Sequence, residues 1–107
     1  MKNQNESEPP SSNQARDATK ALVATDVIIT QKPFLRYVTG SITNSSEHRF
    51  SYLVVKIDLL DENRKVVGEV ADAVLDFGPG QIWHFEAGIV SDGGVAAAQV
   101  KKIKGWL

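Results

Sequence analysis

The segment FSYLVVKIDLLD, residues 50–61, constrains the fold more than any other part of the chain. Its apolar residues recur at every second position: Leu53, Val55, Ile57 and Leu59. In a helix, which turns about 100° per residue, Lys56 and Asp58 would fall among these apolar side chains. The segment is therefore predicted to be a β-strand with Leu53 to Leu59 facing a core, and Tyr52, Val54 and Leu60 facing outward.

Alternation and β-branched residues predict further strands over residues 23–29, 34–43, 65–75, 81–89 and 97–107. In the first of these strands the predicted inward set is Val23, Thr25, Val27 and Ile29. In the last strand, Val100 and Ile103 do not share a strict face, so we expect either a kink between them or a short helical turn near residues 95–99. Gly68 is a candidate β-bulge, and Gly40 is expected to let a large side chain such as Trp83 pack over the backbone.

Turn chemistry separates these segments. Asn44 is expected to bond local backbone groups, and Asp61 to cap amides two residues on, with Asn63 in the left-handed conformation. Pro79 and Gly80 fit the two central positions of a type II turn. The spacing of strands and turns predicts an all-β fold, an antiparallel immunoglobulin-like β-sandwich of about six to seven strands. A small barrel is the structural alternative.

The first 20 residues differ in composition from the rest, because they hold only Met1, Ala15 and Ala18 as hydrophobic residues. We expect residues 1–20 to be a disordered polar leader or linker, and residues 21–107 to be the sandwich domain. The leader lacks the apolar region of a signal peptide. Two interpretations stay open: the tail of a cytoplasmic protein, or a tether to an anchor outside this sequence.

Composition excludes several classes of function. The 107 residues contain no cysteine, which excludes disulfides, thiolate metal sites and a cysteine nucleophile. A net charge of −1 argues against an electrostatic binder of nucleic acid. Apolar runs are only a few residues long, so no segment is predicted to span a membrane.

The residues that carry reactive side chains do not form a recognisable site. His48 and His84 lack partners at metal-ligand spacing; His48 is expected beside a turn and His84 on an exposed sheet face. A carboxylate cluster could bind calcium but fits a solvated hairpin edge better: Asp58, Asp61, Glu62, Glu69, Asp72 and Asp76. A small basic end could touch anionic lipid or protect an edge strand: Lys101, Lys102 and Lys104. We therefore predict no catalytic, cofactor-binding or metal-binding residue.

Three segments in order resemble the FxLYD domain family: VTGSITNS at 38–45, IDLLD at 57–61 followed by RKVV, and GPGQIWHF at 78–85. The resemblance spans roughly residues 22–105. Ile57 and Leu60 stand where the family's naming motif has Phe and Tyr. The water-stress WHy/LEA-14 domains share the pattern more loosely, so that neighbouring family stays open.

The FxLYD resemblance implies an immunoglobulin-like module of bacterial or archaeal envelope proteins. The expected function is a non-enzymatic binding or assembly module, without cofactors, monomeric, that contacts another envelope protein through an exposed edge strand. Membrane attachment would come only through an anchor outside this sequence. The alternatives are a stress-protective domain acting by weak nonspecific contacts, in the cytoplasm if no export segment precedes it, and, third, a small hydrolase that uses His48 or His84.

Overall fold

The computed structural model describes residues 18–90 and 93–107. Its strands are β1 (Val23–Gln31), β2 (Arg36–Thr43), β3 (Phe50–Leu60), β4 (Val66–Phe77), β5 (Ile82–Ile89) and β6 (Ala97–Trp106). Most of the predicted leader, residues 1–17, lies outside the described residues, and Ala18 is buried against the core. No helix in the described part of the chain is long and apolar enough to cross a membrane.

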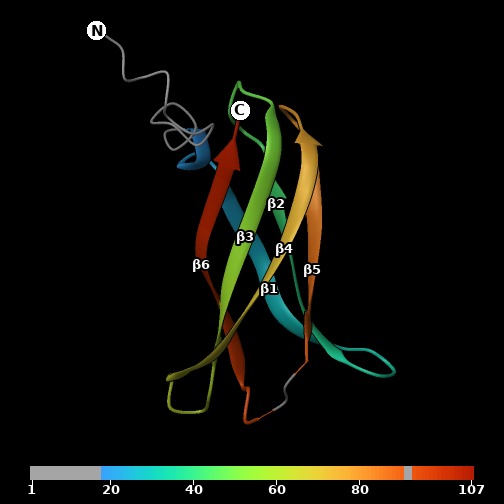
Figure 1. Ribbon diagram of the computed structural model, residues 1–107, viewed down its shortest axis with the longest axis vertical. Coiled ribbons are helices and arrows are strands. Elements are labelled where there is room, and N and C mark those ends of the chain that lie inside the picture. Colours follow the sequence, from blue (N-terminus) through green and yellow to red (C-terminus); the bar gives the residue numbers. More distant parts are fainter. Residues whose placement is uncertain (1–17, 91–92) are drawn as a thin grey trace, which may run out of the picture.

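The strands form two antiparallel sheets, ordered β1-β2-β5 and β4-β3-β6, which pack face to face (Figure 1). This confirms the predicted all-β antiparallel sandwich, with six strands. As in immunoglobulin domains, the first, second and fifth strands share one sheet, and the third and sixth are neighbours in the other. Those domains place a further strand beside the sixth. In the described residues that side of β6 is an open edge.

The predicted core face of β3 is confirmed, because Leu53, Val55, Ile57 and Leu59 are all buried. Leu60, which was predicted to face outward, is buried, since only 4% of it is exposed, although it is not part of the core cluster. The pairing of β3 with β4 shifts between Leu59 and Leu60, where Val67 is the extra residue. This bulge lies beside Gly68, the glycine predicted to mark one, and it breaks the alternation of side chains along β4.

The predicted inward face of β1 is wrong in its first half. The β1–β2 register shifts between Thr25 and Ile28, and Asp26 in this bulge has a φ of 57°. The bulge moves the alternation by one residue, so Val23 is 64% exposed while Ala24 packs against the core. A second bulge, at Lys101 in β6, lies between Val100 and Ile103, and it lets both side chains pack against the core although they are three residues apart.

Gly40 does receive a large side chain, but that side chain is Phe85 and not Trp83. Gly40 and Phe85 are directly opposite on β2 and β5, and a Cβ on Gly40 would overlap the Phe85 ring. Trp83 lies two residues before Phe85 on β5, where it is half-buried and its ring contacts the Phe85 ring. Gly105 on β6 likewise leaves room for an aromatic ring, since a Cβ there would lie 2.7 Å from the buried Phe50 ring.

The turn predictions are largely confirmed. The Asp61 carboxylate accepts hydrogen bonds from the amides of Asn63 (2.8 Å) and Lys65 (2.9 Å). Gly80 has a φ of 80°, and the Gln81 amide closes the turn onto the Gly78 carbonyl. The left-handed residue of the β3–β4 turn is Arg64, with a φ of 67°, and not Asn63 as predicted.

Arg64→Gly is expected to stabilise the protein by up to about 1 kcal/mol, because glycine removes the steric cost of the left-handed conformation. Asn63→Gly is the matched control, and it is expected to give no gain because Asn63 does not have a positive φ. Urea denaturation of both variants measures the difference. A gain in Asn63→Gly alone would contradict the turn assignment.

Candidate binding surfaces

The two histidines do not meet at a common site. His48 is half-buried in the loop before β3, where its carbonyl accepts a hydrogen bond from Asn44. His84 is exposed on β5, as predicted, and its Nδ1 lies 2.8 Å from the Ser41 hydroxyl. Within residues 18–90 and 93–107, no group of three or more His, Cys, Asp or Glu side chains is placed to hold a metal ion.

The Ser41–His84 pair resembles the nucleophile–base contact of a hydrolase, but its surroundings differ from such a site. It lies on the outer face of a sheet, beside a shallow hollow of about 280 Å³. Ser41 belongs to the central strand β2, whose backbone amides are used by the ladders to β1 and β5. These amides therefore cannot form the oxyanion hole that acyl transfer requires.

The predicted carboxylate cluster is dispersed among separate partners. Glu69 Oε1 lies 3.0 Å from Lys101 Nζ, and Asp76 Oδ1 lies 2.9 Å from Arg49 Nη1. Asp72 accepts a backbone hydrogen bond from β5. These contacts join β4 to β6 across β3, to the loop before β3 and to β5 of the other sheet, and they do not converge on one point that a calcium ion could occupy.

The lysines of β6 interact with their own sheet. The hydrogen bond from Lys101 to Glu69, and then the charges of Glu69 and Asp58, raise the pKa of Lys101 above its ordinary value. Lys104 Nζ lies 5.2 Å from the centre of the Trp106 ring, which in turn packs on Tyr52. On the other sheet, the hydrogen bond to Glu86 raises the pKa of Lys32. The side chains of the two ion pairs, Lys101–Glu69 and Lys32–Glu86, are largely in solvent, so these ion pairs contribute little to stability.

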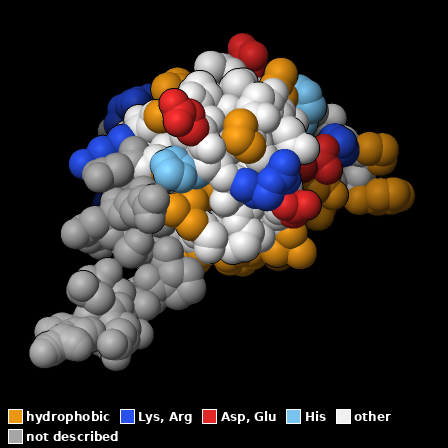
Figure 2. Space-filling model, turned by 90° about the horizontal axis from the view of Figure 1, so that it is seen from above, with side chains coloured by type: hydrophobic (Ala, Val, Ile, Leu, Met, Phe, Trp, Pro, Cys, Tyr) orange, Lys and Arg blue, Asp and Glu red, His pale blue; other side chains and the backbone are white. Residues whose placement is uncertain are grey.

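Charged side chains of both signs lie next to one another on the end of the sandwich that holds Leu107 (Figure 2). Among the exposed hydrophobic residues of the described part of the chain, the two most exposed lie in loops at the opposite end: Phe34 is 96% exposed and Val90 is 88% exposed. Phe34 was predicted to begin a strand, but β2 starts only at Arg36.

The open edges of the two sheets are protected to different degrees. β1 and β6 are each interrupted by a bulge, at Asp26 and Lys101, and β6 carries three lysines. Bulges and lysines are devices that discourage a further strand from pairing. β4 also has a bulge, at Val67, but beyond it β4 pairs with β3 without interruption from Gly68 to Leu75.

Asp72 holds the edges of β4 and β5 together. Its Oδ2 accepts a hydrogen bond from the Glu86 amide of β5 (2.9 Å), and its Oδ1 accepts one from the adjacent Ala73 amide (2.8 Å). The Ala73 amide therefore points away from β3. Because amide direction alternates along a regular strand, the amides of Ala71 and Glu69 also point to the open side.

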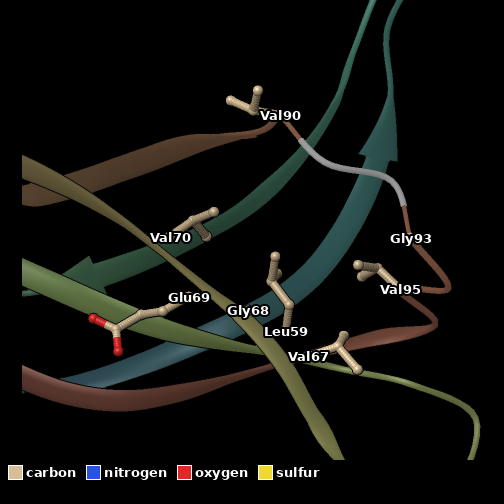
Figure 3. A pocket seen from close by; sticks show the side chains of 8 residues that line it. All are labelled: Leu59, Val67, Gly68, Glu69, Val70, Val90, Gly93 and Val95. Atoms are coloured by element: carbon tan, nitrogen blue, oxygen red, sulfur yellow. The ribbon is translucent and has the colours of Figure 1, made fainter.

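An apolar pocket of about 210 Å³ adjoins this open edge. Figure 3 shows that the aliphatic side chains come from β3, β4 and the β5–β6 connection, while the Glu69 carboxylate points away from them. The lining residues are Leu59, Val67, Gly68, Glu69, Val70, Val90, Gly93 and Val95. Sequence reasoning missed this pocket and the role of Asp72. The one feature of the sequence that pointed to the pocket was Gly68, because a glycine inside a strand leaves space beside the backbone.

Searches against family models, curated proteins and solved structures found no match to this chain.

Proposed function

We propose that the chain is a non-enzymatic, immunoglobulin-like binding or assembly module that binds its partner by pairing with an extended segment along β4. The observation that carries this proposal is the regular β4 edge, where the amides of Glu69 and Ala71 face the open side beside an apolar pocket. Main-chain hydrogen bonds supply the affinity of such strand addition, and side-chain pockets supply its specificity.

The sequence resemblance to the FxLYD family supports a place in the cell envelope and another envelope protein as the partner. Each module would bind as a monomer, joined to the membrane only through an anchor outside this sequence. The other edges offer a weaker template, because β1 and β6 are bulged and the Glu86 amide of β5 is already bonded to Asp72.

Ala71→Pro tests the proposal, because proline removes an amide that faces the open side without removing a bond of the β3–β4 ladder. Random twelve-residue peptides displayed on phage are selected on the full chain, and the enriched peptides are then synthesised. Their affinity for Ala71→Pro is expected to fall by at least about tenfold, since a central main-chain bond is lost. Ala71→Thr, which keeps the amide, is the matched control and is expected to bind like the parent chain.

Amide hydrogen exchange on the parent chain gives a readout that does not depend on how well the proline variant folds. A selected peptide is expected to slow exchange of the Glu69 and Ala71 amides, with smaller changes at the amides of β1 and β6. Enriched peptides that protect neither amide, or that bind Ala71→Pro as tightly as the parent chain, would refute binding along β4. Failure of the selection to enrich any peptide would count against the proposal in the same way.

A further inference from the structure

Two glycines within strands of this protein are covered by a large side chain from the neighbouring strand of the same sheet. Phe85 covers Gly40, and Phe50 covers Gly105. Gly68 is the glycine at the open β4 edge, and no aromatic ring covers it. A Cβ placed there would meet only Leu59, at an ordinary contact distance of 3.4 Å. The space over Gly68 is part of the apolar pocket beside the edge.

We infer that the partner segment is an antiparallel strand that places a large apolar side chain over Gly68 and a lysine or arginine opposite Asp72. This inference rests on the proposed function, since it names the chemistry of the strand that pairs with β4. An antiparallel strand is specified because every strand pair in the described residues is antiparallel.

The apolar residue is specified by the pocket. Val67, Val70, Val90 and Val95 surround the space over Gly68, and Leu59 forms its base. A residue opposite Gly68 on the open side would have its side chain in this space, as Phe85 has opposite Gly40. A few residues carry most of the binding energy of an interface, and they sit in well-packed pockets of this kind.

The basic residue is specified by the charge of Asp72. A carboxylate can accept about four hydrogen bonds, and Asp72 accepts two, from Glu86 and Ala73. Among the described residues it is paired with backbone amides and with no cation, and it is half-buried. Its charge therefore favours an ammonium or guanidinium group from the partner.

The spacing between the two anchors follows from the strand. Gly68, Val70 and Asp72 point to the same face of β4, so Gly68 and Asp72 are roughly 13–14 Å apart along the edge. From its N-terminus, an antiparallel partner strand would therefore have a basic residue at its first position, an apolar residue at its third and a large apolar residue at its fifth. The second and fourth positions are unrestricted. The middle apolar residue would lie beside Val70.

The test uses the synthetic peptide Thr-Lys-Thr-Val-Thr-Phe-Thr, with blocked ends, titrated to millimolar concentration and followed by NMR. The matched peptide carries glutamate in place of lysine. We expect the lysine peptide to shift the Glu69 and Ala71 amides and to bind at least about tenfold more tightly than the glutamate peptide. Asp72→Asn is expected to abolish most of that preference.

Gly68→Val fills the pocket from within and is expected to weaken the lysine peptide at least about tenfold. Because a Cβ at Gly68 makes only ordinary contacts, this variant should fold, and its melting temperature is measured alongside. Ala73→Val is the control, since it places the same β-branched side chain on the outer face of β4, and we expect binding to be unchanged.

The outcomes separate this inference from the proposed function. Equal binding of the two peptides, or binding unaffected by Gly68→Val, would overturn the inference. If phage-selected peptides of another pattern still lose affinity for Ala71→Pro, the proposed function stands without it. If no peptide depends on Ala71, both are overturned.

Discussion

Replacing Phe85 with alanine is expected to lower the free energy of unfolding by about 3–5 kcal/mol, the range for truncation of a buried aromatic residue. Phe85 is 1% exposed, and its ring fills the space over Gly40. The ring also makes an edge contact with Trp83, at 5.9 Å between centroids. The loss therefore combines the lost apolar burial with a cavity over Gly40 in the core. Urea denaturation measures it.

Trp83→Ala is the matched control for Phe85→Ala. Trp83 lies on the same face of β5, but it is half-buried and borders an open hollow beside Leu75 and Ile82. Its truncation removes less buried surface and leaves a space that water can enter, so a smaller loss is expected. A loss below about 1 kcal/mol for Phe85→Ala, or a larger loss for Trp83→Ala, would contradict the assignment of Phe85 as the residue that packs over Gly40.

The fold class follows from local patterns in the sequence. Alternation in residues 50–61 identifies a strand with one buried face, and the glycine, proline and asparagine turns fix where strands end. The bulges at Asp26 and Lys101 could not be predicted, because the extra residue is defined only against a partner strand. For the same reason the sequence misplaced Val23, whose direction depends on the bulge that follows it.

The candidate site depends on sheet order, which lies beyond local patterns. Asp72 appears in the sequence as one of several exposed acids, and only the approach of β4 to β5 gives it two backbone amides to bond. Gly68 likewise appears as a bulge signal. Its importance arises because β4 is an edge, so the space over the glycine stays open. Gly40 and Gly105, in contrast, are each covered by an aromatic ring from the neighbouring strand of their own sheet.

Asn44 joins the end of β2 to the other sheet from a fully buried position. Its Nδ2 donates to the carbonyls of His48 (2.9 Å) and Phe77 (3.1 Å). Its Oδ1 accepts from both the amide and the hydroxyl of Ser46. One side chain thus orders the loop before β3 and bonds the last residue of β4, so the sequence expectation of a purely local turn role was too narrow.

Asn44→Leu is expected to lower the free energy of unfolding by about 2–4 kcal/mol, because it leaves buried partners of the amide without hydrogen bonds. Leucine has a similar volume, so the loss reports the hydrogen bonds more than a cavity. Ser45→Ala is the matched control: Ser45 is exposed and donates one hydrogen bond, to the Ala21 carbonyl, so a change below about 1 kcal/mol is expected. In the Asn44→Leu variant, amide exchange should accelerate first at Ser46, whose amide bonds the Asn44 side chain. Equal stability of the two variants would mean that the Asn44 side chain does not hold the two sheets together.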